Sequence, residues 1–191
     1  MQRSRHGRET QSTTPDGRPA GRAKQRAFAI GALQEGDDLS ELRELLRTAG
    51  VATVGQAVRC LVNAQRAAHG LAPLRPNRRL RLAAEAHGAD MVSHSFFAHV
   101  SPFSGAITDR ARRAGYLAGT RDWSLGEDIA WGEGDLSTPE SIVTAWMNSP
   151  AHRAVILDGE FRDAGVGVTA GVPVGASSLP GATFVLDVGA R

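Results

Sequence analysis

Three residues have side chains that bind metal ions or transfer protons: His99 in SFFAHVSP, Glu127 in LGEDIAWG and His152 in WMNSPAHRAVIL. Two histidines and a carboxylate can hold zinc, and either residue type can act as a general acid or base. If Ser149 caps the following helix, His152 lies in its first turn, where the helix dipole favours a neutral imidazole. The separations of 28 and 25 residues match no local metal motif. A surface role for His99 and a loop role for Glu127 therefore stay open.

The other histidines and the cysteine fit structural roles better. His87 lies on the apolar stripe of a predicted helix, which favours a buried, hydrogen-bonded core histidine. His94 and His69 lie near helix ends, where histidines cap the chain or interact favourably with the helix dipole. Cys60 is predicted to be a small packed side chain in a helix rather than a nucleophile. A single cysteine in 191 residues excludes a fold built on internal disulfides.

The elements that must position these residues are mostly helical, with strands late in the chain. Two apolar runs, 164–172 and 183–189, are joined by a Gly/Pro/Ser loop and predict a hairpin. Helices followed by strands indicate an α+β fold, with helices packed on a small antiparallel sheet. Apolar periodicity and helix-start residues predict helices over 51–69, over 78–95 with Asn77 as its N-cap, and over 107–114. Two more helices are predicted to start at Thr138-Pro139 and Ser149-Pro150.

The N-terminal part differs in composition from the rest of the chain. Residues 1–33 have seven basic and two acidic side chains and are predicted to be a disordered tail; 34–52 is predicted to be an appended helix or linker. The remainder of the chain is slightly acidic, which makes nucleic acid an unlikely partner. No apolar run is long enough to span a membrane. The best signal-peptide candidate, 27–33, is short and runs into acidic residues, which leaves a cytoplasmic location open.

Six ordered blocks give the chain a specific family resemblance. They are LVNAQRAAHGLAPLRPNRRLRLAAEAHGADM, FFAHVSP, GEDIAWG, AWMNSPAHRAVIL, DAGVGV and TFVLDVG. From about residue 53 to 191 the chain resembles the bacterial branch of the CAP superfamily, the SCP domain of cysteine-rich secretory, antigen 5 and pathogenesis-related proteins. The resemblance implies an α-β-α sandwich with an open groove that holds two histidines and acidic residues.

The resemblance also assigns site residues. It places His99, Glu127 and His152 in the groove as candidate ligands of Zn²⁺ or another divalent ion, with no organic cofactor. Animal and plant members have a second glutamate at the W-x-x-E offset from Trp146, where this chain has Ser149. The usual GEN is GED here, so Asp128 follows Glu127 and adds a second acid. Trp146, Ser149 and Asp128 are thus expected to line the groove.

Three functions follow from this site. The first is a non-enzymatic, extracytoplasmic binding module for a metal or small ligand, because no nucleophile with an adjacent base is visible. The second is a metal-dependent peptide or ester hydrolase, in which zinc on His99 and His152 acts with Glu127. The third is a structural domain without metal. The family resemblance implies an extracellular or cell-envelope protein, a monomer, with a lipid or envelope component as its ligand.

Overall fold

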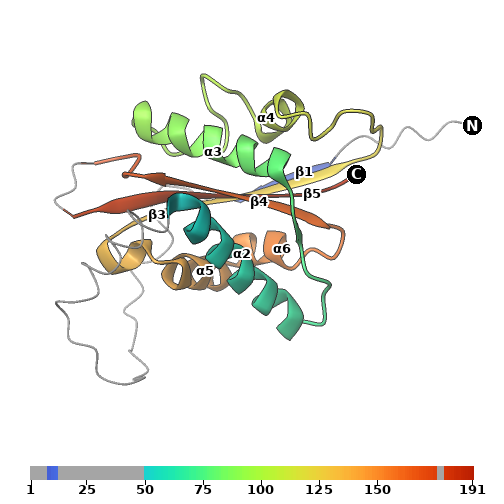
Figure 1. The fold of residues 1–191 in the computed structure, drawn as a ribbon, viewed down its shortest axis with the longest axis horizontal. Coiled ribbons are helices and arrows are strands. Elements are labelled where there is room, and N and C mark those ends of the chain that lie inside the picture. The colour runs from blue at the N-terminus through green and yellow to red at the C-terminus, as the bar shows by residue number, and fades with distance from the viewer. Residues whose placement is uncertain (1–7, 13–49, 176–178) are drawn as a thin grey trace, which may run out of the picture.

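The computed structural model describes residues 8–12, 50–175 and 179–191. They form a sheet between two layers of helices, which confirms the predicted α-β-α sandwich (Figure 1). One face of the sheet is covered by α3 (Arg78–Ser93) and α4 (Ile107–Arg113). The other face is covered by α2 (Gly50–Ala68), α5 (Pro139–Asn148) and α6 (Pro150–Ile156).

The centre of the sheet is antiparallel, as the sequence predicted, and two short parallel strands flank it. The strand order is β1-β3-β5-β4-β2, and β5 (Gly181–Ala190) pairs antiparallel with both β3 (Ser124–Glu133) and β4 (Asp163–Ala170). The outer strands, β1 (Arg8–Ser12) and β2 (Arg75–Pro76), pair parallel with β3 and β4. The predicted hairpin is confirmed as β4–β5. The parallel strands lie at the edges, where unpaired backbone groups can accept a further strand.

Three helix-start predictions agree with the structure. The Asn77 side chain caps α3 by accepting hydrogen bonds from the N–H groups of Arg79, at 3.0 Å, and Leu80, at 3.3 Å. Thr138 caps α5 through the N–H of Ser141 at 3.2 Å, with proline in the first turn. Ser149 occupies the N-cap position of α6 but makes no side-chain capping bond. The predicted helix over 107–114 corresponds to α4.

Two glycines of β4 allow α3 to lie directly on the sheet. A Cβ atom at Gly165 would overlap backbone atoms of Leu80 and Arg81, and one at Gly167 would overlap backbone atoms of Ala84 and Glu85. The alternate residues of β4 point to the opposite face and join the core beneath α2 and α5. The DAGVGV block is therefore a packing motif that brings α3 close to the sheet.

Three expectations are corrected or left open. Residues 8–12, expected in a disordered tail, form β1, because the edge of β3 offers backbone groups for pairing. Cys60, expected to be packed, is exposed. The appended helix predicted over 34–52 lies outside the described residues apart from 50–52, which belong to α2. Among the described residues, no helix combines the length and apolar character needed to cross a membrane.

Candidate functional site

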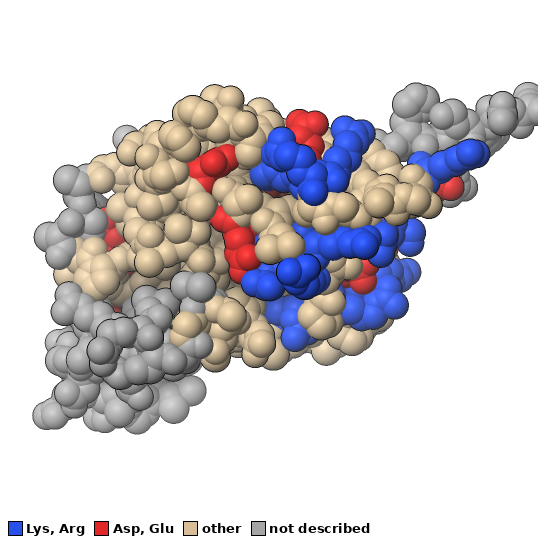
Figure 2. Space-filling model, turned by 45° about the horizontal axis from the view of Figure 1, so that its top comes forward, with Lys and Arg blue, Asp and Glu red and all other residues tan. Residues whose placement is uncertain are grey.

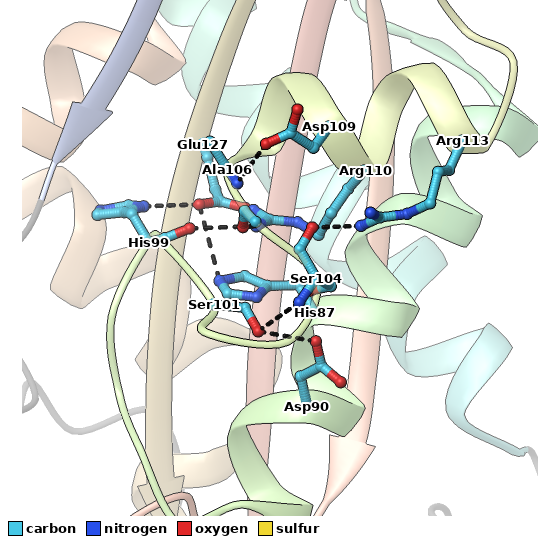
Figure 3. Close-up of polar contacts among 11 residues, drawn as sticks. His87, Asp90, His99, Ser101, Ser104, Ala106, Asp109, Arg110, Arg113 and Glu127 are labelled. Carbon is cyan, nitrogen blue, oxygen red and sulfur yellow. Dashed lines mark hydrogen bonds and ion pairs between the residues drawn. The ribbon is translucent and has the colours of Figure 1, made fainter.

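The candidate site is organised around one buried carboxylate, Glu127, on β3. His99 Nδ1 donates a hydrogen bond to Glu127 Oε1 at 2.7 Å, from the loop between α3 and α4. His87, on α3, places its Nε2 3.9 Å from the same oxygen. Figure 3 shows both rings directed at the carboxylate. Because β3 side chains alternate, Glu127 faces the α3/α4 layer together with its neighbours Leu125 and Ile129.

A buried arginine contacts the second carboxylate oxygen of Glu127. The Arg110 guanidinium, from α4, forms an ion pair with Oε2. Its Nη1 also donates to the backbone carbonyls of His99, at 3.2 Å, and Gly105, at 2.6 Å. Arg110 therefore fixes the loop that carries His99 and neutralises the acid to which that histidine is bonded.

The last two residues of α4 are arginines that point outward. Arg112 and Arg113 are exposed, whereas Arg110 is buried. Figure 2 shows basic side chains gathered on one half of the side of the molecule that carries α3 and α4. Arg110 thus differs from the other arginines of its helix because it points into the Glu127 cluster, where it has a carboxylate partner.

The electrostatics of the cluster follow from its contacts. Burial alone would raise the pKa of Glu127, but the His99 hydrogen bond and the Arg110 charge outweigh it and lower that pKa to about 2. Burial lowers the pKa of His87 to about 4, although the Glu127 charge opposes the shift. At neutral pH, Glu127 is ionised and His87 is neutral.

Two further acids lie beside Glu127. Asp187 on β5 is its cross-strand partner, and Asp128 follows it on β3. Both are fully buried, and burial together with the Glu127 charge raises both pKa values well above the ordinary range. Asp187 shares the face of Glu127, whereas Asp128 alternates to the opposite face with Ala130. Asp128 therefore does not add charge to the side of the sheet where Glu127 meets His99.

The loop that carries His99 is fixed by a small hydrogen-bonded turn. The Ser101 hydroxyl donates to Asp90 Oδ2 at 2.9 Å and accepts from the N–H groups of Phe103 and Ser104, both at 3.0 Å. Ser101 and Gly105 also exchange backbone hydrogen bonds of 3.0 and 2.9 Å. Hydrogen bonds from serines lower the pKa of Asp90 despite its partial burial. The turn orients His99 toward Glu127.

His152 and Trp146 come from the opposite helix layer. His152 is buried on α6, and Trp146 is fully buried on α5, where its Nε1 donates to the Ile129 carbonyl at 3.4 Å. Ser149, between these helices, is half-buried. Trp146 is part of the core beneath the sheet. The structure thus brings Glu127 and His99 together, while His152 belongs to a layer on the other face of the sheet.

The metal role of these residues stays a prediction. The described residues contain no group of three His, Cys, Asp or Glu side chains arranged to hold a metal ion. Glu127 already bonds His99 and faces the positive charge of Arg110, which disfavours a cation on the same carboxylate. A carboxylate that accepts a hydrogen bond from a histidine Nδ1 fixes the tautomer and the orientation of the ring. The geometry therefore favours Glu127 as the residue that orients His99, and not as a direct metal ligand.

Sequence reasoning missed three members of the cluster. Arg110 lies in the arginine-rich TDRARR run, and its burial depends on a partner 17 residues away. Asp187 stands in the strand-like TFVLDVG, where an acid flanked by apolar residues is the available signal. His87 is buried as predicted, but it faces Glu127, so it belongs to the site instead of an ordinary core.

Comparisons with known proteins agree with this architecture. The chain is 40% identical over 107 residues to the uncharacterized protein YkwD of Bacillus subtilis (strain 168); the match covers 56% of this chain and 39% of YkwD. It therefore spans about two fifths of the length of that relative.

Two solved structures share the fold. One is an extracellular protein containing an SCP domain from Bacillus anthracis, with a TM-score of 0.59, 23% identity, and coverage of 83% of this chain and 44% of that one. The other is an outer surface protein of Borrelia burgdorferi, with a TM-score of 0.53, 16% identity, and coverage of 83% of this chain and 96% of that one.

A family model covers more than half of the chain. The cysteine-rich secretory protein (CAP) model matches residues 60–174, which include α3, β3, α5, α6 and β4 and therefore His99, Glu127 and His152. Together with the sandwich architecture, this match confirms the resemblance expected from the sequence blocks. The chain belongs to the cysteine-rich secretory protein family as a bacterial-type CAP domain.

Proposed function

We propose that this CAP domain is a non-enzymatic binding module that works outside the cytoplasm, with His99 as its ligand-contacting group. The observation that carries the proposal is the engagement of both Glu127 oxygens, one by His99 and the other by Arg110. A carboxylate with a pKa near 2 and an ion-paired oxygen is a poor general base, because a base works best with a pKa near the operating pH. The same carboxylate is well placed to orient an imidazole.

The location outside the cytoplasm is supported by the fold neighbours. One is described as an extracellular protein and the other as an outer surface protein. A ligand from the cell envelope, including a lipid, fits such a location.

A divalent ion is the simplest ligand to test. If one binds, His99 and His152 are the residues that would hold it. Glu127 would orient His99 through the hydrogen bond that it accepts from Nδ1. The ion would add a Lewis acid to the site.

Isothermal titration with ZnCl₂ tests this assignment. The variants are His99→Ala/His152→Ala and, as a matched control, His69→Ala/His94→Ala, which removes two exposed histidines. We expect one-to-one binding by the wild type and the control, and loss of binding in the His99/His152 variant. Binding that survives in that variant would refute the metal assignment. If the wild type does not bind zinc, the ligand is not this metal, and lipid and envelope components become the probes.

The hydrolase alternative makes a different prediction. If Glu127 activates water, Glu127→Gln abolishes zinc-stimulated cleavage of a peptide or ester substrate. The proposal expects no such cleavage by the wild type. Zinc-dependent turnover that is lost in Glu127→Gln would overturn it in favour of the enzyme.

A further inference from the structure

The outer edge of β3 is occupied by a strand from the distant N-terminal part of the chain. Residues 8–12 run parallel to β3, with Arg8 paired to Ser124 and Ser12 paired to Asp128. β3 is bonded on its other side to β5 over its whole length. β3 is thus the last antiparallel strand on this side of the sheet, and β1 pairs with its outer edge (Figure 1).

This strand passes the candidate site. Its register places Gln11 beside Glu127 and Ser12 beside Asp128. The helix α6, which carries His152, also lies against β1. Whatever occupies the β3 edge therefore lies next to the acid that orients His99 and next to the helix of the second predicted site histidine.

β1 is short and its sequence is polar. It has five residues, Arg-Glu-Thr-Gln-Ser, and none is of an apolar type. By contrast, β5 and β3 pair over ten residues. Residues 13–49 separate β1 from α2 along the sequence. β1 pairs with β3 through its backbone, and an extended peptide of different sequence could supply such pairing.

We propose that the outer edge of β3 is a docking edge for an extended peptide, and that residues 8–12 of the chain are its displaceable internal occupant. The proposal rests on the binding-module function and names its ligand class: a polypeptide segment that adds a parallel strand next to Glu127. Main-chain hydrogen bonds would supply the affinity, as in other cases of strand addition. Because the internal strand competes for the same edge, an external peptide would need a higher concentration to bind the intact chain than to bind a free edge.

The competition can be estimated from the tether. A covalent tether gives an effective concentration on the order of 1 mM. If the free peptide has a dissociation constant of about 0.1 mM, the internal strand is bound roughly tenfold more often than it is released. An external peptide then binds the intact chain about tenfold more weakly than it binds an open edge.

The first experiment measures hydrogen exchange of the β3 amides in the full chain. Thr10→Pro/Gln11→Pro removes adjacent N–H groups from β1, so any parallel pairing in this register loses a donor. The control, Ser4→Pro/Arg5→Pro, places two prolines outside β1. We expect the outward-facing amides of residues 124–128 to exchange about tenfold faster in the β1 variant and unchanged in the control. Equal exchange in the two variants would overturn the proposal.

The second experiment adds the strand back as a separate molecule. A fluorescent peptide of residues 6–14, HGRETQSTT, is titrated into the β1 variant and into the wild type and followed by fluorescence anisotropy. We expect binding to the β1 variant near 0.1 mM, about tenfold weaker binding to the wild type, and no binding of the peptide carrying the two prolines. Failure of the peptide to bind the β1 variant, or equal binding of the proline peptide, would refute strand addition.

The two proposals fail separately. The zinc titration uses variants that leave β1 and its partner residues on β3 unchanged, whereas the exchange and peptide experiments leave His99, Glu127 and His152 unchanged. If zinc does not bind but the peptide does, the peptide-docking edge stands without the metal ligand. If the peptide experiments fail while zinc binds, β3 is not a docking edge, and the binding module is left with its metal ligand alone.

Discussion

Replacing Arg110 by Met tests whether the Glu127 cluster is held together by charge. The substitution removes two hydrogen bonds to carbonyls, worth about 1 kcal/mol each, and leaves Glu127 as a buried carboxylate without its cation. Removal of one partner of a buried ion pair costs roughly 3–5 kcal/mol. Since the two contributions overlap, we expect Arg110→Met to lower the free energy of unfolding by about 4 kcal/mol.

The double variant separates the charge effect from the lost hydrogen bonds. Glu127→Gln alone leaves the Arg110 cation buried and is expected to cost about 3 kcal/mol. In Arg110→Met/Glu127→Gln both charges are gone, and the remaining cost is mainly the lost carbonyl bonds, about 2 kcal/mol. The sum of the single costs should therefore exceed the double cost by about 5 kcal/mol, the sign of direct coupling.

Urea unfolding at pH 7 measures all three variants, and Arg112→Met is the control. Arg112 is exposed on the same helix and should change the free energy of unfolding by no more than about 0.5 kcal/mol. The m-values should match the wild type, so that the midpoints can be compared. Additive single costs would show that Arg110 and Glu127 act independently, which would refute the coupled cluster.

Three further predictions concern the surroundings of the cluster. The pKa of His87 is about 6.5 in the unfolded chain and about 4 in the folded one, so the unfolded chain binds a proton first as the pH is lowered. The free energy of unfolding should therefore fall by about 3 kcal/mol as the pH is lowered from 6.5 to 4. Urea titrations across this range should show a shallower loss in His87→Gln; identical pH profiles would contradict this shift. Arg66, fully buried, donates to the carbonyls of Ala72, Ile156 and Asp158, so Arg66→Met should cost about 3 kcal/mol in urea; a cost below about 1 would show that these bonds are not needed. Gly167→Ala should cost more than about 2 kcal/mol in thermal unfolding because its Cβ meets the backbone of α3, whereas Gly159→Ala, with ordinary contact distances, should be nearly neutral; equal melting temperatures would refute the close packing.

Local signals in the sequence were sufficient for most of the helices and for the hairpin. Asn77 and Thr138 act as caps where the sequence predicted them, because capping depends on a few adjacent backbone groups. β3 could not be predicted in the same way: LGEDIAWG combines glycines with two adjacent acids, a composition unfavourable for strands. Those acids are tolerated because neighbouring layers supply Arg110 and His99 to one, and burial raises the pKa of the other, which favours its neutral form.

The candidate site shows the same division between local and long-range information. His99 and Glu127 were identified from their sequence blocks, and the structure places them in direct contact. The role of Glu127 could not be derived in that way, because it depends on Arg110, which is adjacent to it only in the folded chain. An arginine in an arginine-rich helix has no sequence feature that marks it as the buried one.

The charge balance of the cluster explains how so many polar groups are accommodated inside the sandwich. Glu127 and Arg110 cancel as an ion pair, while burial raises the pKa of Asp187 and lowers the pKa of His87, and both shifts favour the neutral forms. The main polarity of the site is the direction imposed on His99. Such a site offers little to attract a charged substrate, but a ligand that brings its own backbone hydrogen bonds can lie beside it without disturbing that balance. For this reason a peptide strand at the β3 edge is compatible with the buried pair, whereas a ligand that must bind the Glu127 carboxylate itself would have to break the pair.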